Sequence, residues 1–104
     1  MAVDAWFVYV ARCADDTLYV GIARDVATRI AAHDAGKGAR YTRGRGPLVV
    51  LGTKRCSSKG DALRLELALK RLERTTKLRI ASSPTLLTRF ARSHKKARGV
   101  KAGT

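Results

Sequence analysis

The chain has 104 residues, of which 22 are lysine or arginine and only 8 are aspartate or glutamate, so its net charge is +14. That length suits one domain with a modest core and is too short for two, and a surface so one-sided favours nucleic acid as a partner over acidic membranes. The sequence contains neither an apolar run of about 18 residues nor a signal-peptide pattern, so we expect a cytosolic protein that does not bind membranes.

A β-hairpin is predicted near the start of the chain. Residues 5–12 are β-branched or aromatic at both alternating sets of positions, which favours a central strand covered on both faces. Residues 14–17 predict a turn and residues 18–22 the returning strand. Because side chains alternate, Tyr9 and Tyr19 share a face only if the loop has an odd number of residues. We therefore expect a three-residue loop, covering residues 14–16 or 15–17.

A helix is predicted to follow this hairpin. It runs to about residue 35, between Asp25, a favourable N-cap, and Gly36, a natural stop. Arg29 and His33 lie at positions i and i+4, beside the apolar stripe rather than opposite it. We expect both side chains to reach over the sheet.

Residues 36–47 form a segment that is rich in glycine and basic, without a single acid. This composition predicts an ordered loop. Its cations are expected to contact the phosphates of nucleic acid without reading bases, and basic residues from Arg89 onward are expected to strengthen that contact. The four cations of the loop are Lys37, Arg40, Arg43 and Arg45. A third strand is predicted over residues 48–53, followed by a polar connection.

A second long helix is predicted over residues 59–73, with Glu66 beside its leucine stripe. A carboxylate in such a place costs free energy unless a cation or a metal meets it. Lys70, one turn later, is the simplest partner. Short helices are expected over residues 77–81 and 84–92, and residues 93–104 are expected to form a basic, disordered tail.

Each of these side chains also has an ordinary explanation when it is taken alone. Tyrosine is common in half-buried strands, and exposed arginine is the norm on a helix, so Tyr9, Tyr19 and Arg29 need have no function. His33 alone is compatible with either packing or function. Only their combination points to a shared site.

In combination, these features resemble the GIY-YIG nuclease family, over roughly residues 6–72. The resemblance is carried by two tripeptides, Phe7-Val8-Tyr9 and Tyr19-Val20-Gly21, by the arginine and histidine of the first helix, by Tyr41-Thr42-Arg43 in the loop, and by Glu66 with Lys70. It is strongest to the small stand-alone members. The glycine of the first motif is missing, although its phenol is kept, and Ile22 stands where some repair nucleases of the family have lysine.

The resemblance implies a small α/β (α+β) domain over residues 1–92, with a three-stranded, mainly antiparallel sheet flanked by helices on both faces. It also implies one divalent metal, Mg²⁺ or Mn²⁺, held by Glu66 with water and phosphate as further ligands. Arg29 would hold a non-bridging phosphate oxygen. Tyr9 or Tyr19 would act as the base for an attacking water, and His33 would accept the phenolic proton or contact phosphate.

We therefore expect a metal-dependent endonuclease that acts on structured, nicked or damaged DNA, in repair or recombination, as a monomer or weak dimer. Lys70 and the four loop cations are the expected nucleic-acid contacts. Two alternatives remain open. One is a non-catalytic protein that uses the same fold to bind DNA or RNA, and the other is a basic accessory domain associated with the ribosome.

Overall fold

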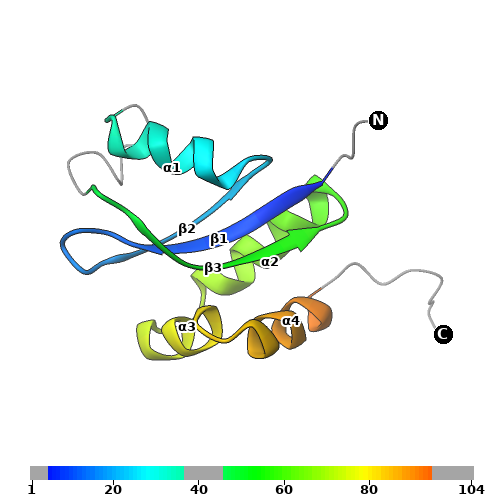
Figure 1. The fold of residues 1–104 in the computed structure, drawn as a ribbon. Helices are drawn as coiled ribbons and strands as arrows, with labels where there is room; N and C mark the ends of the chain where they lie inside the picture. The colour runs from blue at the N-terminus through cyan, green and yellow to red at the C-terminus, as the bar shows by residue number, and fades with distance from the viewer. Residues whose placement is uncertain (1–4, 37–45, 95–104) are drawn as a thin grey trace, which may run out of the picture.

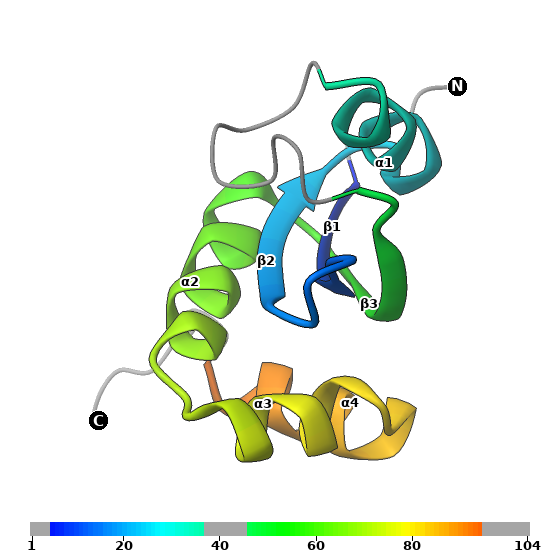
Figure 2. The same cartoon turned by 90° about the vertical axis from the view of Figure 1, so that its left-hand side faces the viewer.

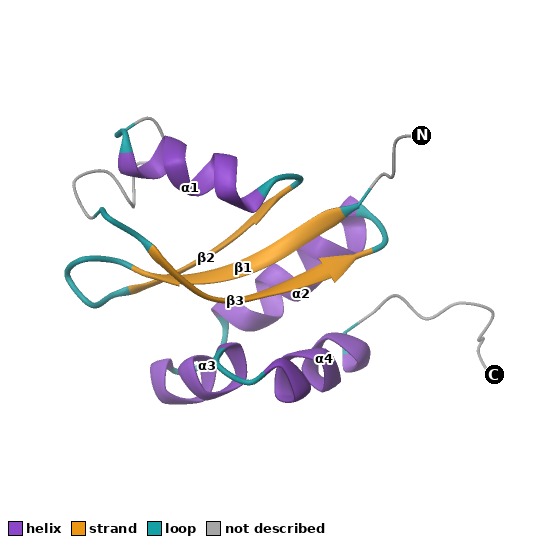
Figure 3. Ribbon diagram, viewed as in Figure 1, coloured by secondary structure: helices purple, strands orange, loops and turns teal. Residues whose placement is uncertain are grey.

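The structure, a computed structural model, describes residues 5–36 and 46–94. The elements follow in the order β1 (Trp6–Arg12), β2 (Leu18–Ala23), α1 (Val26–Asp34), β3 (Val49–Cys56), α2 (Lys59–Lys70), α3 (Arg74–Ala81) and α4 (Pro84–Ser93), as Figure 1 and Figure 3 show. The predictions for Lys37, Arg40, Arg43, Arg45 and the tail beyond residue 94 lie outside the described residues.

The three strands form one antiparallel sheet in the order β2-β1-β3. Helix α1 covers one face, and α2, α3 and α4 cover the other (Figure 1). The central position of β1 explains why both of its alternating sets are apolar, since each set packs under a different layer of helices. This arrangement confirms the predicted α/β fold. Within the described residues, no helix is long and apolar enough to cross a membrane.

The hairpin between β1 and β2 has the predicted odd loop. The amide of Cys13 donates to the carbonyl of Thr17 over 2.8 Å, which leaves the three residues 14–16 as the loop. Asp16 closes the turn in the left-handed region, with φ of 70°. In this register Tyr9 faces Gly21 and Ala11 faces Tyr19, so both tyrosines lie on the α1 face of the sheet.

The two faces of the sheet bury separate cores. On the α1 face, Tyr9 and Ala11 form a small cluster with Leu48, and Val26 and Ile30 of α1 pack against it. The larger core, on the opposite face, joins valines of the sheet to leucines and alanines of the other helices: Val8, Val10, Val20, Ala62, Leu65, Leu69, Ala81 and Leu87. The main hydrophobic core therefore holds α2, and with it Glu66, on the face opposite the tyrosines.

Three predicted boundaries were wrong. Strand β3 continues to Cys56 instead of ending at residue 53, because its polar residues pair with β1 as an edge strand, where one side is open to solvent. Helix α2 ends at Lys70 instead of residue 73, as the amide of Leu72 bonds to the carbonyl of Leu69 in a tighter final turn. Glu73 is extended and begins α3 three residues earlier than predicted.

Candidate active site

The hydroxyl of Tyr9 is the centre of the candidate site. Tyr9 lies in the middle of β1 with 1% of its surface exposed, and its Oη is 3.1 Å from Nε2 of His33. Gly21 lies opposite it on β2, and a Cβ added there would stand 2.7 Å from Oη of Tyr9 and 2.9 Å from the ring of Tyr19. The glycine of the second tripeptide therefore leaves room for the phenol of the first.

His33 is the buried partner of this phenol. It lies in the last turn of α1, with 1% of its surface exposed. Burial, helped by the positive charge of Arg29, lowers the pKa of His33 below its ordinary value of 6.5, so the ring is neutral at pH 7. A neutral imidazole with its proton on Nδ1 accepts a hydrogen bond at Nε2. In that tautomer the Tyr9 hydroxyl donates to His33.

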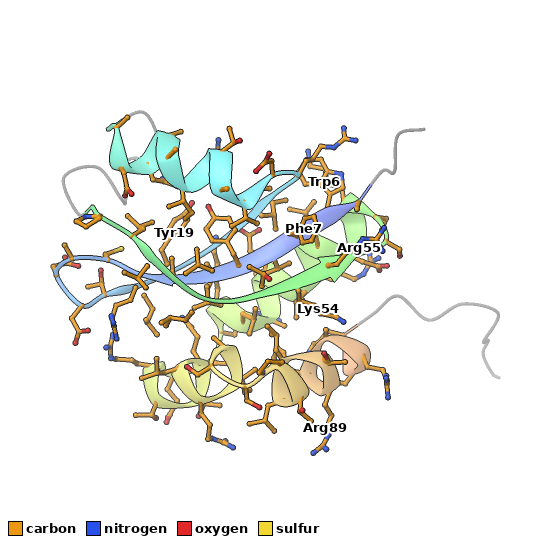
Figure 4. All side chains as sticks on the ribbon, viewed as in Figure 1. Trp6, Phe7, Tyr19, Lys54, Arg55 and Arg89 are labelled. Atoms are coloured by element: carbon orange, nitrogen blue, oxygen red, sulfur yellow. The ribbon has the colours of Figure 1, made fainter. Side chains whose placement is uncertain are left out.

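Tyr19 completes the aromatic part of the site. Its ring centroid is 6.1 Å from that of Tyr9 and 5.2 Å from that of His33, which it meets edge-on at 67°. Tyr19 is half-buried, whereas Tyr9 is enclosed. The two phenols therefore differ in their surroundings: the hydroxyl of Tyr9 is bonded to the imidazole, while Tyr19 is partly open to solvent. Figure 4 shows Tyr19 on the α1 side of the sheet.

Arg29 brings a positive charge to the same phenol. Its guanidinium acts on Tyr9 as a hydrogen-bond partner and as a nearby charge, and both effects favour the ionised phenol. Burial and the neighbouring Tyr19 act in the opposite direction and dominate, which raises the pKa of Tyr9 to about 12. At pH 7 Tyr9 therefore carries its proton. Arg29 itself is exposed, so its charge is also accessible from solvent.

Glu66 approaches this group from the other side of the sheet. Helix α2 runs alongside the edge strand β2 (Figure 2), and the charge of Glu66 is close enough to raise the pKa of Tyr9 further. Its side chain is 18% exposed, and Oε2 lies 3.3 Å from Nζ of Lys70. The predicted ion pair with Lys70 is therefore present, and the charge of Glu66 also acts on Tyr9.

Glu66 is suited to be the one protein ligand of a metal ion. Among the described residues there is no group of three or more His, Cys, Asp or Glu side chains that could enclose a metal. A thiolate or imidazole cage of the kind that selects zinc is thus not formed there. One partly exposed carboxylate suits a hard cation such as Mg²⁺, which keeps several of its waters and takes further oxygen from a phosphate.

Of the five side chains that the sequence selected as catalytic, the structure gathers four on the α1 face of the sheet: Tyr9, Tyr19, Arg29 and His33. The fifth, Glu66, lies on α2 and acts on Tyr9 through its charge. Lys70, a predicted nucleic-acid contact, is 52% exposed beside Glu66. The sequence did not indicate Lys77, whose pKa is lowered by burial and by the charge of Lys70. No local sequence pattern could have predicted this shift, since Lys77 lies on α3 and Lys70 on α2.

Comparison with known proteins matches the sequence of this chain to one family. The model of the GIY-YIG catalytic domain matches residues 5–79. A UPF0213 protein of Cupriavidus necator is 49% identical over 74 residues, which cover 71% of this chain and 80% of that protein. A UPF0213 protein of Natronomonas pharaonis is 47% identical over 85 residues, covering 82% and 99%. The solution NMR structure of a UPF0213 protein from Bacillus halodurans has 39% identity, coverage of 81% and 93%, and a TM-score of 0.49.

Proposed function

Because this chain belongs to the GIY-YIG catalytic domain family, we propose that it is a metal-dependent endonuclease that hydrolyses phosphodiester bonds in DNA. The observation that supports this most is the set of groups around one hydroxyl. Tyr9 is bonded to His33 over 3.1 Å and lies within the electrostatic reach of both Arg29 and Glu66. Packing alone does not require an acid from the opposite helix layer at this point.

Tyr9 is the better candidate for the base, because its hydroxyl already has a proton acceptor in His33. A phenol with a pKa of about 12 is not ionised at neutral pH. Tyr9 would therefore pass its own proton to Nε2 of His33 while it takes one from the attacking water. The water loses a proton, Tyr9 ends as a neutral phenol and His33 becomes an imidazolium. Tyr19 would orient the water from the solvent side.

Arg29 and Glu66 would act on the phosphate. The exposed guanidinium of Arg29 would bind a non-bridging oxygen, a bond that strengthens as negative charge builds in the transition state. Glu66 would hold the divalent metal, Mg²⁺ or Mn²⁺, which when bound polarises the phosphoryl oxygens. Lys70 would then turn from the carboxylate toward a neighbouring phosphate. A net charge of +14 supports a polyanionic substrate, and we propose structured, nicked or damaged DNA in repair or recombination.

The test is a nicking assay on supercoiled plasmid and on branched, flapped and damaged DNA, with Mg²⁺, with Mn²⁺ and with chelator. Tyr9→Phe, Arg29→Ala and Glu66→Gln are each expected to lower the rate by roughly 10²-fold or more, with little loss of salt-sensitive binding. Glu73→Gln and Arg79→Ala are matched controls on exposed residues of the α3 region. Equal nicking by the wild type and all three active-site variants would refute the enzymatic proposal.

A non-catalytic protein that binds DNA or RNA is the second candidate. One observation favours it: the carboxylate of Glu66 already has a cation partner in Lys70, at 3.3 Å. Tight binding to branched DNA or to RNA, with no cleavage under either metal, would identify this function. In that case Glu66→Gln would leave affinity unchanged.

A further inference from the structure

A cavity of about 320 Å³ lies between the end of β3, the start of α2, and α4. Lys54 lines it and pairs across the sheet with Val8, whose side chain belongs to the core under α2. Tyr9, one position further along β1, points to the opposite face. Figure 4 shows Lys54 on the α4 side of the sheet and Tyr19 on the α1 side. The cavity and the tyrosine cluster are therefore separated by the sheet.

The lining of this cavity is positively charged. Two cations on this face of the sheet line it, Lys54 and Arg92, and neither forms an ion pair within the part of the chain that the structure describes. Arg55 also borders the cavity, but it pairs with Phe7 and its side chain therefore points to the other face. The one acid in the lining, Asp61, is already neutralised, since it pairs with Arg64 at 2.5 Å. It also accepts a hydrogen bond from the hydroxyl of Ser57 over 3.2 Å. The charge left for a ligand to meet is therefore cationic.

Other features of the cavity also suit an anion. Thr88, which carries a hydroxyl, lines one wall. Helix α2 borders the cavity through Asp61, whose amide donates to Oγ of Ser58 over 3.1 Å, so this amide adds no further donor for a ligand. Buried Leu65 is part of the floor, and an apolar surface strengthens charge interactions next to it.

We propose that this cavity binds a backbone phosphate of nucleic acid, so that the protein holds a second segment on the face opposite the tyrosine cluster. Phosphate is an anion that matches two cations beside a threonine, because each cation can form a charge-assisted hydrogen bond with one of its oxygens. The choice of nucleic acid as its source rests on the proposed function. A protein with phosphate sites on both faces of its sheet is suited to substrates with two arms, such as a flap or a branch.

The test compares two double variants that lose the same charge. Lys54→Gln with Arg92→Gln removes two cations of the cavity, and Arg71→Gln with Arg79→Gln removes two exposed cations elsewhere. Both are made in Glu66→Gln protein, and binding is measured without metal over a salt series, so the result does not depend on cleavage. On flapped DNA the cavity variant is expected to flatten the slope of log affinity against log salt by about two units, and the control by far less.

A short linear duplex provides the second comparison, because it occupies only one face. The cavity variant is expected to bind it with the slope of the parent protein. Equal slopes for both double variants on flapped DNA would overturn the proposal, whether or not the wild type nicks DNA. NMR titrations then separate the sources of phosphate: DNA is expected to shift the amides of Cys56 and Thr88. Shifts from inorganic phosphate with none from DNA would also overturn it. Unchanged melting temperatures would exclude misfolding as the cause.

Discussion

Replacing Gly21 by alanine is expected to destabilise the protein by disturbing the tyrosine pair. The added Cβ would stand 2.7 Å from Oη and 2.8 Å from Cζ of Tyr9, and 2.9 Å from a ring carbon of Tyr19. Tyr9 has little freedom to move, since only 1% of its surface is exposed and its hydroxyl is bonded to His33. Either the strand shifts, or Tyr9 leaves its partner.

The expected magnitude follows from two opposing effects. An extra methyl group in a well-packed site costs about 1–3 kcal/mol. Loss of glycine's freedom in the unfolded chain returns about 0.4–1 kcal/mol. From the middle of the two ranges, the net loss of unfolding free energy is about 1.3 kcal/mol, which for a domain of this size lowers the melting temperature by roughly 5–10 °C. The nicking rate should fall by more than the loss of folded protein explains, because the added methyl group disturbs the hydrogen bond between Tyr9 and His33.

Urea unfolding followed by the fluorescence of Trp6, the only tryptophan, measures this change. Gly60→Ala is the matched control, since a Cβ there meets nothing nearer than 3.5 Å and the residue lies in α2. Alanine is preferred in a helix, so this variant is expected to gain about 0.5 kcal/mol. The change from glycine to alanine is thus expected to lower the free energy of unfolding at position 21 and to raise it at position 60. A Gly21→Ala protein as stable as the wild type would refute the close packing of Tyr9 on Gly21.

Four further expectations follow from the same contacts. Because the pKa of Tyr9 is raised to about 12, its contribution to stability is full below about pH 10 and is lost as the pH rises from 10 toward 12. Denaturant midpoints measured across this range should fall, and the Tyr9→Phe variant should not show this fall. The pKa of His33 is lowered, so stability is full above about pH 6.5 and falls as the pH drops below it, and His33→Gln should reduce this acid dependence. Gly52→Ala should destabilise more than Gly21→Ala, because its Cβ would meet the carbonyl oxygen of Ala81, a backbone atom; a cost below about 1 kcal/mol would contradict this. Joint replacement of the loop arginines Arg40, Arg43 and Arg45 should flatten the slope of log DNA affinity against log salt by roughly two to three units. An unchanged slope would mean that these arginines do not contact phosphate.

Local patterns were sufficient to predict most of the fold. The double apolar alternation of β1 predicted a central strand, and Asp25 with Gly36 predicted the ends of α1. The boundaries that failed depended on tertiary contacts instead. The polar end of β3 is a strand only because β1 lies beside it, and a single strand of polar residues carries no such signal.

The candidate site divides in the same way. Alternation and loop length placed Tyr9 beside Tyr19, and helical spacing placed His33 one turn after Arg29. These relations are short-range, so the order of residues determines them. No spacing rule relates the sheet to Glu66, which lies on another helix.

The sequence by itself thus determined which chemical groups the protein carries and which of them share a strand face or a helix turn. The tertiary structure alone decided that α2 lies along the edge of β2, so that the charge of Glu66 acts on a phenol on the other face of the sheet. It also decided that the phenol rests on a glycine, and that Lys54 and Arg92 line one cavity. The physical reason is that burial of the leucine face of α2 fixes the helix position, and this depends on packing across the whole domain.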